Sequence, residues 1–164
     1  MIIRAAEPTE VAAVGNLTLA AYVADGFLSP DDDYADELRN AAGRAADAEL
    51  VVAADESGAV LGTVTFVLAG TPWAEVAAPG EAEFRMLAVA PEGRGRGVGS
   101  ALTSWCIERA RSHGCTGLVL SSMDRMRTAH RLYERLGFRR VPELDWTPVP
   151  HVQLIAYRLD LGPA

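Results

Sequence analysis

The sequence predicts a mixed α/β domain whose elements follow the order β-α-α-β-β-β-α-β-α-β-β. Three observations support this fold class. The chain has 164 residues, which is the usual size of one domain. Short apolar runs typical of strands alternate with segments whose apolar residues recur at helical spacing. No linker or internal repeat divides the sequence, so we expect a single domain over residues 1–164.

The first half of the sequence holds three expected strands and two expected helices. The strands are short apolar runs over residues 1–5, 50–54 and 60–68. The first helix starts at Pro8 and should end near Gly26, and a weaker helix covers 36–46. A glycine-containing turn at 56–58 joins the second and third strands and suits an antiparallel hairpin. An irregular loop follows over 69–80.

The second half combines four strands with two helices. The strands are expected over 82–89, 118–120, 138–141 and 152–159. The helix after the glycine-rich segment has apolar residues at every third or fourth position from Val98 to Cys106, which predicts one buried face. A further helix over 125–136 stops at Gly137, because glycine favours the end of a helix. A proline-rich segment, 142–150, joins the last two strands.

Composition and charge narrow the classes of function. The net charge is −7, from 22 acidic and 15 basic residues, and this disfavours nucleic acid as a partner because phosphate neutralisation needs clustered positive charge. The apolar runs are too short to span a membrane and no leader segment opens the chain, so we expect a cytoplasmic protein without membrane contact. Cys106 and Cys115 lack the spacing of a zinc site, so we expect reduced core residues and no metal.

Charge is distributed unevenly along the chain. Residues 25–56 hold ten acids against two arginines, whereas 81–140 hold eleven arginines against six acids. A molecule of this kind could bind a cationic ligand with one region and an anionic ligand with the other.

The segment from Arg94 to Gly99 reads Arg-Gly-Arg-Gly-Val-Gly and lies between an expected strand and an expected helix. Backbone N–H groups at such a position can hold a phosphate, and glycine lets them approach the anion. A Walker loop is excluded because no Gly-Lys-Ser/Thr follows, and the dinucleotide fingerprint fails because Ser100 stands where its third glycine would be. On this segment alone, a flexible strand-to-helix turn remains open.

Two ordered motifs resemble the GNAT superfamily of N-acetyltransferases, which depend on acetyl-coenzyme A (acetyl-CoA). The run Glu83–Pro91, followed by Arg94, Gly97 and Gly99, resembles the acetyl-CoA segment of that family. The run 129–138, AHRLYERLGF, is similar to its helix-to-strand motif. The resemblance covers almost the whole chain. It implies a mostly antiparallel, twisted sheet of about six to seven strands flanked by about four helices.

The resemblance also implies an activity and a cofactor. The expected reaction moves an acetyl group from acetyl-CoA to a primary amine of a small molecule or peptide by direct transfer. The family places pyrophosphate on the amides of 94–99 and pantetheine on the backbone of 87–89, where the Leu87 amide would face the oxyanion. Met126 stands where the family often has an asparagine. The residues expected to bind the cofactor are Leu87, Ala88, Val89, Arg94, Gly95, Arg96, Gly97, Val98, Gly99, Ser100 and Met126.

Tyr133 and Glu83 are the expected catalytic residues. A phenol with its ordinary pKa near 10 stays protonated at neutral pH and can donate to the departing thiolate. The family motif gives Tyr133 this general-acid role, and a plain core tyrosine is the alternative. Glu83 corresponds to a position that some family members use as general base. A solvated carboxylate at the strand end, with water as the base, remains open.

The acceptor is expected beside the loop between the first two helices. The expected substrate-binding residues are Phe27, Asp31, Asp33, Tyr34 and Trp73. Carboxylates attract an ammonium group, and aromatic rings add apolar or cation–π contact. The loop therefore favours a cationic amine over an acidic amino acid as acceptor. A merely solvated acidic surface is the alternative.

One alternative function and one question of assembly stay open. Met126 in place of asparagine mildly favours a degenerate, non-catalytic family member that binds coenzyme A as a sensor or partner module. The C-terminal strands could also pair with those of a second copy in a homodimer, by analogy alone.

Overall fold

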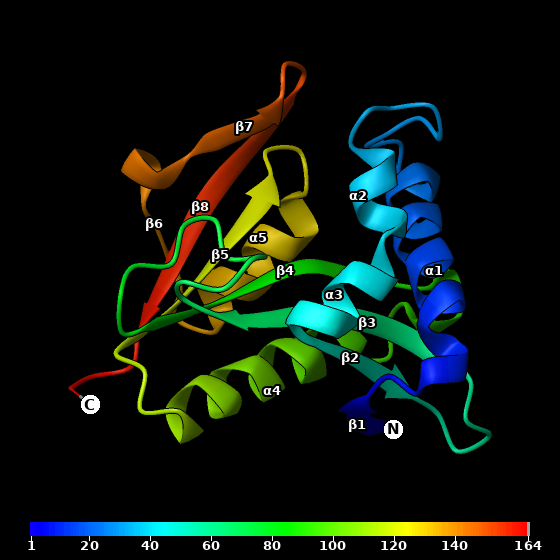
Figure 1. Cartoon of the computed structure of the whole chain (residues 1–164), viewed down its shortest axis with the longest axis horizontal. Helices are drawn as coiled ribbons and strands as arrows, with labels where there is room; N and C mark the ends of the chain where they lie inside the picture. Colours follow the sequence, from blue (N-terminus) through cyan, green and yellow to red (C-terminus); the bar gives the residue numbers. More distant parts are fainter. Residues whose placement is uncertain (164) are drawn as a thin grey trace.

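The computed structural model describes residues 1–163 and has one sheet with helices on both of its faces (Figure 1). Within these residues the sheet has eight strands in the order β1-β2-β3-β4-β5-β8-β6, and β7 pairs with β8. The strands are β1 (Ile2–Ala5), β2 (Glu49–Ala54), β3 (Val60–Leu68), β4 (Glu81–Val89), β5 (Gly117–Met123), β6 (Arg139–Arg140), β7 (Trp146–Val149) and β8 (Val152–Asp160).

Neighbouring strands are antiparallel except β4 and β5, which are parallel. The predicted fold class, mixed α/β with a mostly antiparallel sheet, is confirmed. The sequence prediction misses β7, which lies within the proline-rich segment 142–150. Pro148 is tolerated there because β7 pairs only with β8, and proline is confined to edge strands since it has no N–H to donate.

Five α-helices lie within residues 1–163, and none of them is long and apolar enough to cross a membrane. They are α1 (Val11–Ala24), α2 (Ala35–Arg39), α3 (Ala41–Asp47), α4 (Val98–Ser112) and α5 (Arg127–Arg135). The prediction of one helix over 36–46 is wrong, because α2 and α3 are separated at Asn40. The Asn40 side chain accepts a hydrogen bond of 3.0 Å from the Gly43 amide and so starts a new helix.

The helices form two layers around the sheet. On one face, α4 and α5 pack against the buried cluster that contains Phe84, Leu102, Leu118 and Tyr133. On the other face, α1, α2 and α3 pack against two further clusters. The meander β2-β3-β4 lies between these layers (Figure 1). Its two faces therefore supply most of the core.

A bulge in β4 changes which side chains face each layer. Met86 has φ +56°, in the left-handed region, and the pairing with β3 shifts at this point. Phe84 before the bulge and Leu87 after it both pack on the α4 side, whereas Met86 packs on the α1 side. The alternation of side chains between the two faces of β4 thus shifts by one residue at the bulge.

The sheet opens next to this bulge. The parallel pairing of β4 with β5 ends at Phe84 and Leu120, although β4 continues to Val89 and β5 to Met123. From there β4 stays with β3, and β5 stays with β8. The second half of β4 therefore has no partner on its β5 side.

Candidate active site

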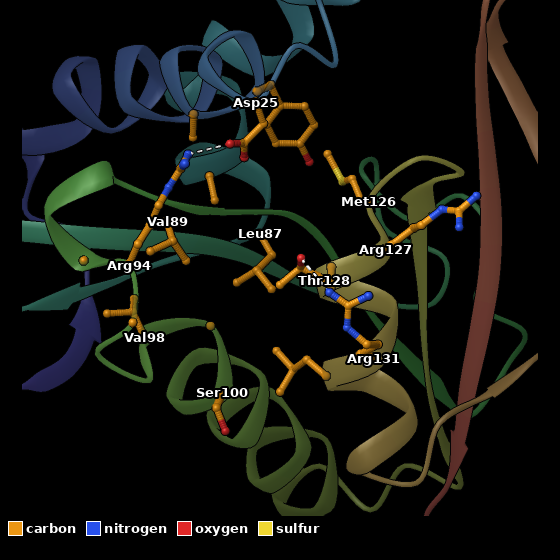
Figure 2. A pocket seen from close by; sticks show the side chains of 18 of the residues that line it. Asp25, Leu87, Val89, Arg94, Val98, Ser100, Met126, Arg127, Thr128 and Arg131 are labelled. Atoms are coloured by element: carbon orange, nitrogen blue, oxygen red, sulfur yellow. Dashed lines mark hydrogen bonds and ion pairs between the residues drawn. The ribbon is translucent and has the colours of Figure 1, made fainter.

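The opening between β4 and β5 leads into a cavity of about 690 Å³ (Figure 2). Its walls come from the second half of β4, the glycine-rich loop, the start of α4, α5 and the C-terminal end of α1. All but one of the residues predicted to bind the cofactor line it, namely Leu87, Ala88, Val89, Arg94, Gly95, Gly97, Val98, Gly99, Ser100 and Met126. The structure thus brings together residues from three separate segments of the chain.

Arg96 is the exception. It is exposed and does not line the cavity, and its Nη1 donates a long hydrogen bond of 3.5 Å to the Glu92 carbonyl oxygen. The structure therefore does not place Arg96 with the other predicted cofactor residues.

The glycine-rich loop presents the start of α4 to the cavity. Gly95 and Gly97 have φ values of +72° and +74°, a conformation that strains other L residues. A Cβ added at either glycine would meet no atom within 4 Å, so the backbone conformation requires glycine and packing does not. Gly97 precedes the first residue of α4, whose first N–H groups have no partner within the helix. This end of a 15-residue helix suits an anion.

Further arginines line the same cavity, and sequence reasoning missed them. Arg125, Arg127, Arg131 and Arg135 belong to α5 and the turn before it. Three of them recur every fourth residue, which would have placed them on one helical face. Across the cavity, Arg94 forms an ion pair of 2.8 Å with Asp25 at the end of α1 (Figure 2). Five of the eleven arginines of residues 81–140 therefore line this cavity.

A second, smaller cavity of about 40 Å³ lies where β4 and β5 diverge. Tyr133 lines it and is only 3% exposed, and burial raises the pKa of its hydroxyl above the ordinary value, so the group stays protonated. Tyr22 of α1 lines both cavities, although its place on a helical apolar face gave no signal in the sequence. Leu87 and Met126 also line both cavities.

Glu83 lies outside both cavities. Its side chain is fully buried, which makes the alternative of a solvated carboxylate wrong. Oε1 accepts three hydrogen bonds of 2.9 to 3.1 Å from the amides of residues 75–77, whereas Oε2 has no hydrogen-bond partner among the described residues. Burial raises the pKa of the carboxyl, and the three amides oppose this rise. Glu83 therefore holds the loop before β4.

The three aromatic residues predicted to bind the acceptor share one hydrophobic cluster, and the two predicted acids lie outside it. Phe27 lines the large cavity, where Arg125 donates to its carbonyl oxygen at 2.8 Å. Asp31 and Asp33 are exposed on the loop and line neither cavity. Tyr34 is buried, and Trp73 donates its Nε1–H to the Gly43 carbonyl oxygen at 3.2 Å. Of these five residues, only Phe27 lines either cavity.

Comparison with known proteins identifies the class of protein that this fold and cavity define. The model of the acetyltransferase (GNAT) family matches residues 13–138. An uncharacterised N-acetyltransferase of Schizosaccharomyces pombe is 31% identical over 136 residues, which cover 83% of this chain and 77% of that protein.

Solved structures agree on the fold. A GNAT acetyltransferase of Staphylococcus aureus superposes with a TM-score of 0.77 and 16% identity, over 98% of each chain. A phosphinothricin acetyltransferase of Sinorhizobium meliloti in complex with acetyl-CoA superposes with a TM-score of 0.71 and 22% identity, over 98% of this chain and 88% of that chain. The protein belongs to the GNAT family of N-acetyltransferases.

Proposed function

We propose that this enzyme transfers the acetyl group of acetyl-CoA directly to the amino group of a primary amine, on a small molecule or a peptide. One observation carries the proposal: the wide cavity with its amides and arginines and the narrow cavity with Tyr133 share Leu87 and Met126 as walls. The cavity that suits an anion and the cavity that holds a protonated phenol therefore adjoin each other. Acyl transfer needs both.

The large cavity suits acetyl-CoA by its chemistry. The N–H groups at the start of α4 and the arginines of α5 suit the pyrophosphate and phosphate groups. The backbone of β4 beyond Phe84 is free of β5, so its polar groups can pair with the amides of the pantetheine arm. Met126 adds an apolar contact where the family often has an asparagine. When bound, acetyl-CoA supplies the acetyl group as a thioester.

Two groups at the junction of the cavities would act on the reacting atoms. The Leu87 amide lies on the unpaired stretch of β4 and is our candidate donor to the oxyanion of the tetrahedral intermediate. The Tyr133 hydroxyl is our candidate acid for the thiolate, because burial keeps it protonated. The amine nitrogen would first bond to the acetyl carbon, and the carbon–sulfur bond would then break as the thiolate takes the proton of the Tyr133 hydroxyl.

Glu83 remains the proposed base, but its carboxylate cannot contact the acceptor directly. Because its carboxylate lines neither cavity, a proton from the acceptor ammonium would reach it through an intervening group or water. The three amides on Oε1 favour the charged form that a base requires, and Oε2 is left to accept the proton.

The test is amine-dependent release of free thiol from acetyl-CoA by the purified protein, with the acetylated amine identified by mass spectrometry. We expect release to require both the protein and an amine, and to yield one acetylated amine per thiol. A non-catalytic coenzyme-binding module would bind acetyl-CoA in calorimetry and release no thiol with cationic, neutral or anionic amines. That result would overturn the proposal.

A further inference from the structure

Arg85 is a buried cation to which the reaction above assigns no role. It lies on β4 just before the bulge and is 4% exposed. Its guanidinium carbon is 5.9 Å from the ring centroid of Trp73 and 5.8 Å from that of Trp146. Nη1 donates to the Trp73 carbonyl oxygen at 3.1 Å. Nη2 is buried and no acceptor within residues 1–163 is in hydrogen-bond geometry with it, although the Tyr34 hydroxyl also interacts with the Arg85 side chain.

The charge of Arg85 is only loosely balanced. The carboxylates of Glu75 and Glu37 lie 3.7 and 3.8 Å from its nitrogens, too far for a good hydrogen bond. Both carboxylates are also largely open to solvent, with side chains 40% and 48% exposed, so water screens them. The Glu83 carboxylate nearby is engaged with the loop amides.

A second buried guanidinium adds to the positive potential. Arg44 is fully buried and lies 6.0 Å from the ring centroid of Trp73, the ring that Arg85 also contacts. It donates to the carbonyl oxygens of Glu37 and Leu38, and its Nε has no acceptor among the described residues. Burial, with a smaller contribution from the like charge of Arg85, lowers the pKa of Arg44 to about 10. Two cations thus share one buried region.

An oxyanion would balance the positive charge of this region and accept hydrogen bonds from its unpaired N–H groups. Burying a cation with a free N–H is costly unless a partner of opposite charge is supplied. A planar guanidinium matches the oxygens of a carboxylate or a phosphonate. Arg85 lines the small cavity together with Tyr133 and Leu87, so an anion held there would lie beside the reacting atoms.

We propose that the acceptor amine carries an oxyanion, a carboxylate or a phosphonate, a few bonds from its amino group, and that Arg85 selects it. The inference rests on the proposed acetyltransferase function. It opposes the cationic preference predicted from Asp31 and Asp33, whose carboxylates lie on the surface outside both cavities. Arg85 is inside the site and those acids are not.

The experiment compares matched acceptors in the thiol-release assay. Leucine, leucinamide and isopentylamine share one side chain and differ in the group beside the amine, and an aminoalkyl phosphonate tests the second oxyanion. Repeating the set with smaller and larger side chains separates anion preference from side-chain fit. We expect the anionic member of each set to have the highest kcat/KM, by about 10²-fold or more over its neutral partner.

Variants connect the preference to Arg85. Arg85→Gln should lower kcat/KM for the anionic acceptor, chiefly through KM, and leave the neutral acceptor almost unchanged. Arg85→Lys keeps the charge and should retain part of the preference. Arg109→Gln is the matched control, because Arg109 pairs with Glu49 on the surface away from both cavities. It should leave every ratio as in the unmutated enzyme.

A second measurement needs no variant and serves if Arg85→Gln fails to fold. 4-Methylpentanoate, which is leucine without its amino group, should compete with the anionic acceptor, and its amide should not. Equal rates for acid and amide, a preference for cationic amines, or a preference that survives in Arg85→Gln would overturn the assignment. Absence of transfer to every amine would instead contradict the acetyltransferase proposal itself.

Discussion

Tyr133 belongs to the aromatic core and to the small cavity at the same time. Its ring centroid lies 5.9 Å from those of Phe84, Phe138 and Tyr157, so the ring is held by three neighbours. Such packing fixes where the hydroxyl points, which a proton donor needs. Tyr133 can therefore be a core residue and a catalytic residue at once. The ring serves the core, and only the hydroxyl would serve catalysis.

Tyr133→Phe should remove the acid and keep the packing. We expect kcat to fall by about 10²-fold, with the melting temperature and the affinity for acetyl-CoA almost unchanged. Steady-state rates with a saturating amine, together with thermal unfolding, measure both. Tyr157→Phe is the control, because Tyr157 is equally buried and lines neither cavity. Equal losses in the two variants would return Tyr133 to the role of a core residue.

Glu83→Gln tests the base through pH dependence. A base works when deprotonated, so kcat/KM should fall as the pH drops through the Glu83 pKa, which burial raises above its ordinary value of 4.5. In the Glu83→Gln variant, kcat/KM should not show this fall at low pH. Stability has the opposite sign: a carboxyl with a raised folded pKa makes the folded state less stable as pH rises through that window. The Glu83→Gln variant should therefore lose less stability than the unmutated enzyme as the pH rises through this range.

Glu81→Gln is the matched control for this profile. Glu81 lies on the same strand and also binds the loop, accepting from the Ala78 amide at 2.8 Å. Its substitution should loosen the loop without changing the shape of the pH profile. If both variants gave the profile of the unmutated enzyme, water would be the base.

The residue-level prediction fails where a backbone detail decides which way a side chain points. The glycines and Leu87 follow from a local motif and lie in the cavity as predicted. Arg85 and Tyr22 could not be found in this way. The bulge at Met86 places Leu87 on the α4 side, and nothing in the sequence marks a methionine for a left-handed conformation. The tertiary structure therefore determines which residues meet across the opening, and the local sequence does not.

At the scale of elements, the junction of the glycine-rich loop and α4 depends on two left-handed glycines. The open space around both means that a larger side chain would point toward the cavity or solvent without a clash inside the protein. The cost of substitution is then of two kinds, backbone strain and an obstructed approach to the amides.

Gly97→Val separates these costs when compared with Gly58→Val. Gly58 has φ +89° in the hairpin turn between β2 and β3, and a Cβ there also meets no atom within 4 Å. Both variants should melt at lower temperature. Ligand at 100 times its Kd stabilises a protein by about 2.7 kcal/mol, so acetyl-CoA should raise the melting temperature of Gly58→Val as in the unmutated enzyme. It should not do so in Gly97→Val. An equal shift in both would exclude the loop as the phosphate site.

Elements with strong local signals are the ones that could be predicted. The hairpin β2-β3, the helix after the glycine-rich loop and the stop at Gly137 follow from turn chemistry and spacing. The break at Asn40 also has a local signal, which the prediction missed, because asparagine is a favoured N-cap and binds the Gly43 amide three residues on. The strand β7 has none, because it depends on the free edge of β8.

At the scale of the whole molecule, the basic region of the sequence contributes to one site and the acidic region does not. Five of the eleven arginines of 81–140 line the large cavity, so the net charge of −7 does not describe the surface that an anionic cofactor would meet. The acids of 25–56 show no such convergence: Asp32 pairs with His151 at 2.7 Å, and Asp31 and Asp33 remain exposed. The arginines converge because a helix and a loop bring five of them to one cavity.

The opening between β4 and β5 also bears on the order in which the chain folds. The meander β2-β3-β4 is built from neighbours in sequence, which close short loops at small entropic cost. The contact of β4 with β5 must wait for α4 to cross the sheet, and that of β5 with β8 for the whole C-terminal third. We therefore expect the meander to form early and the C-terminal strands to dock on it late. The cavity lies along the join between the two, so we expect its walls to be complete only after the C-terminal strands have docked.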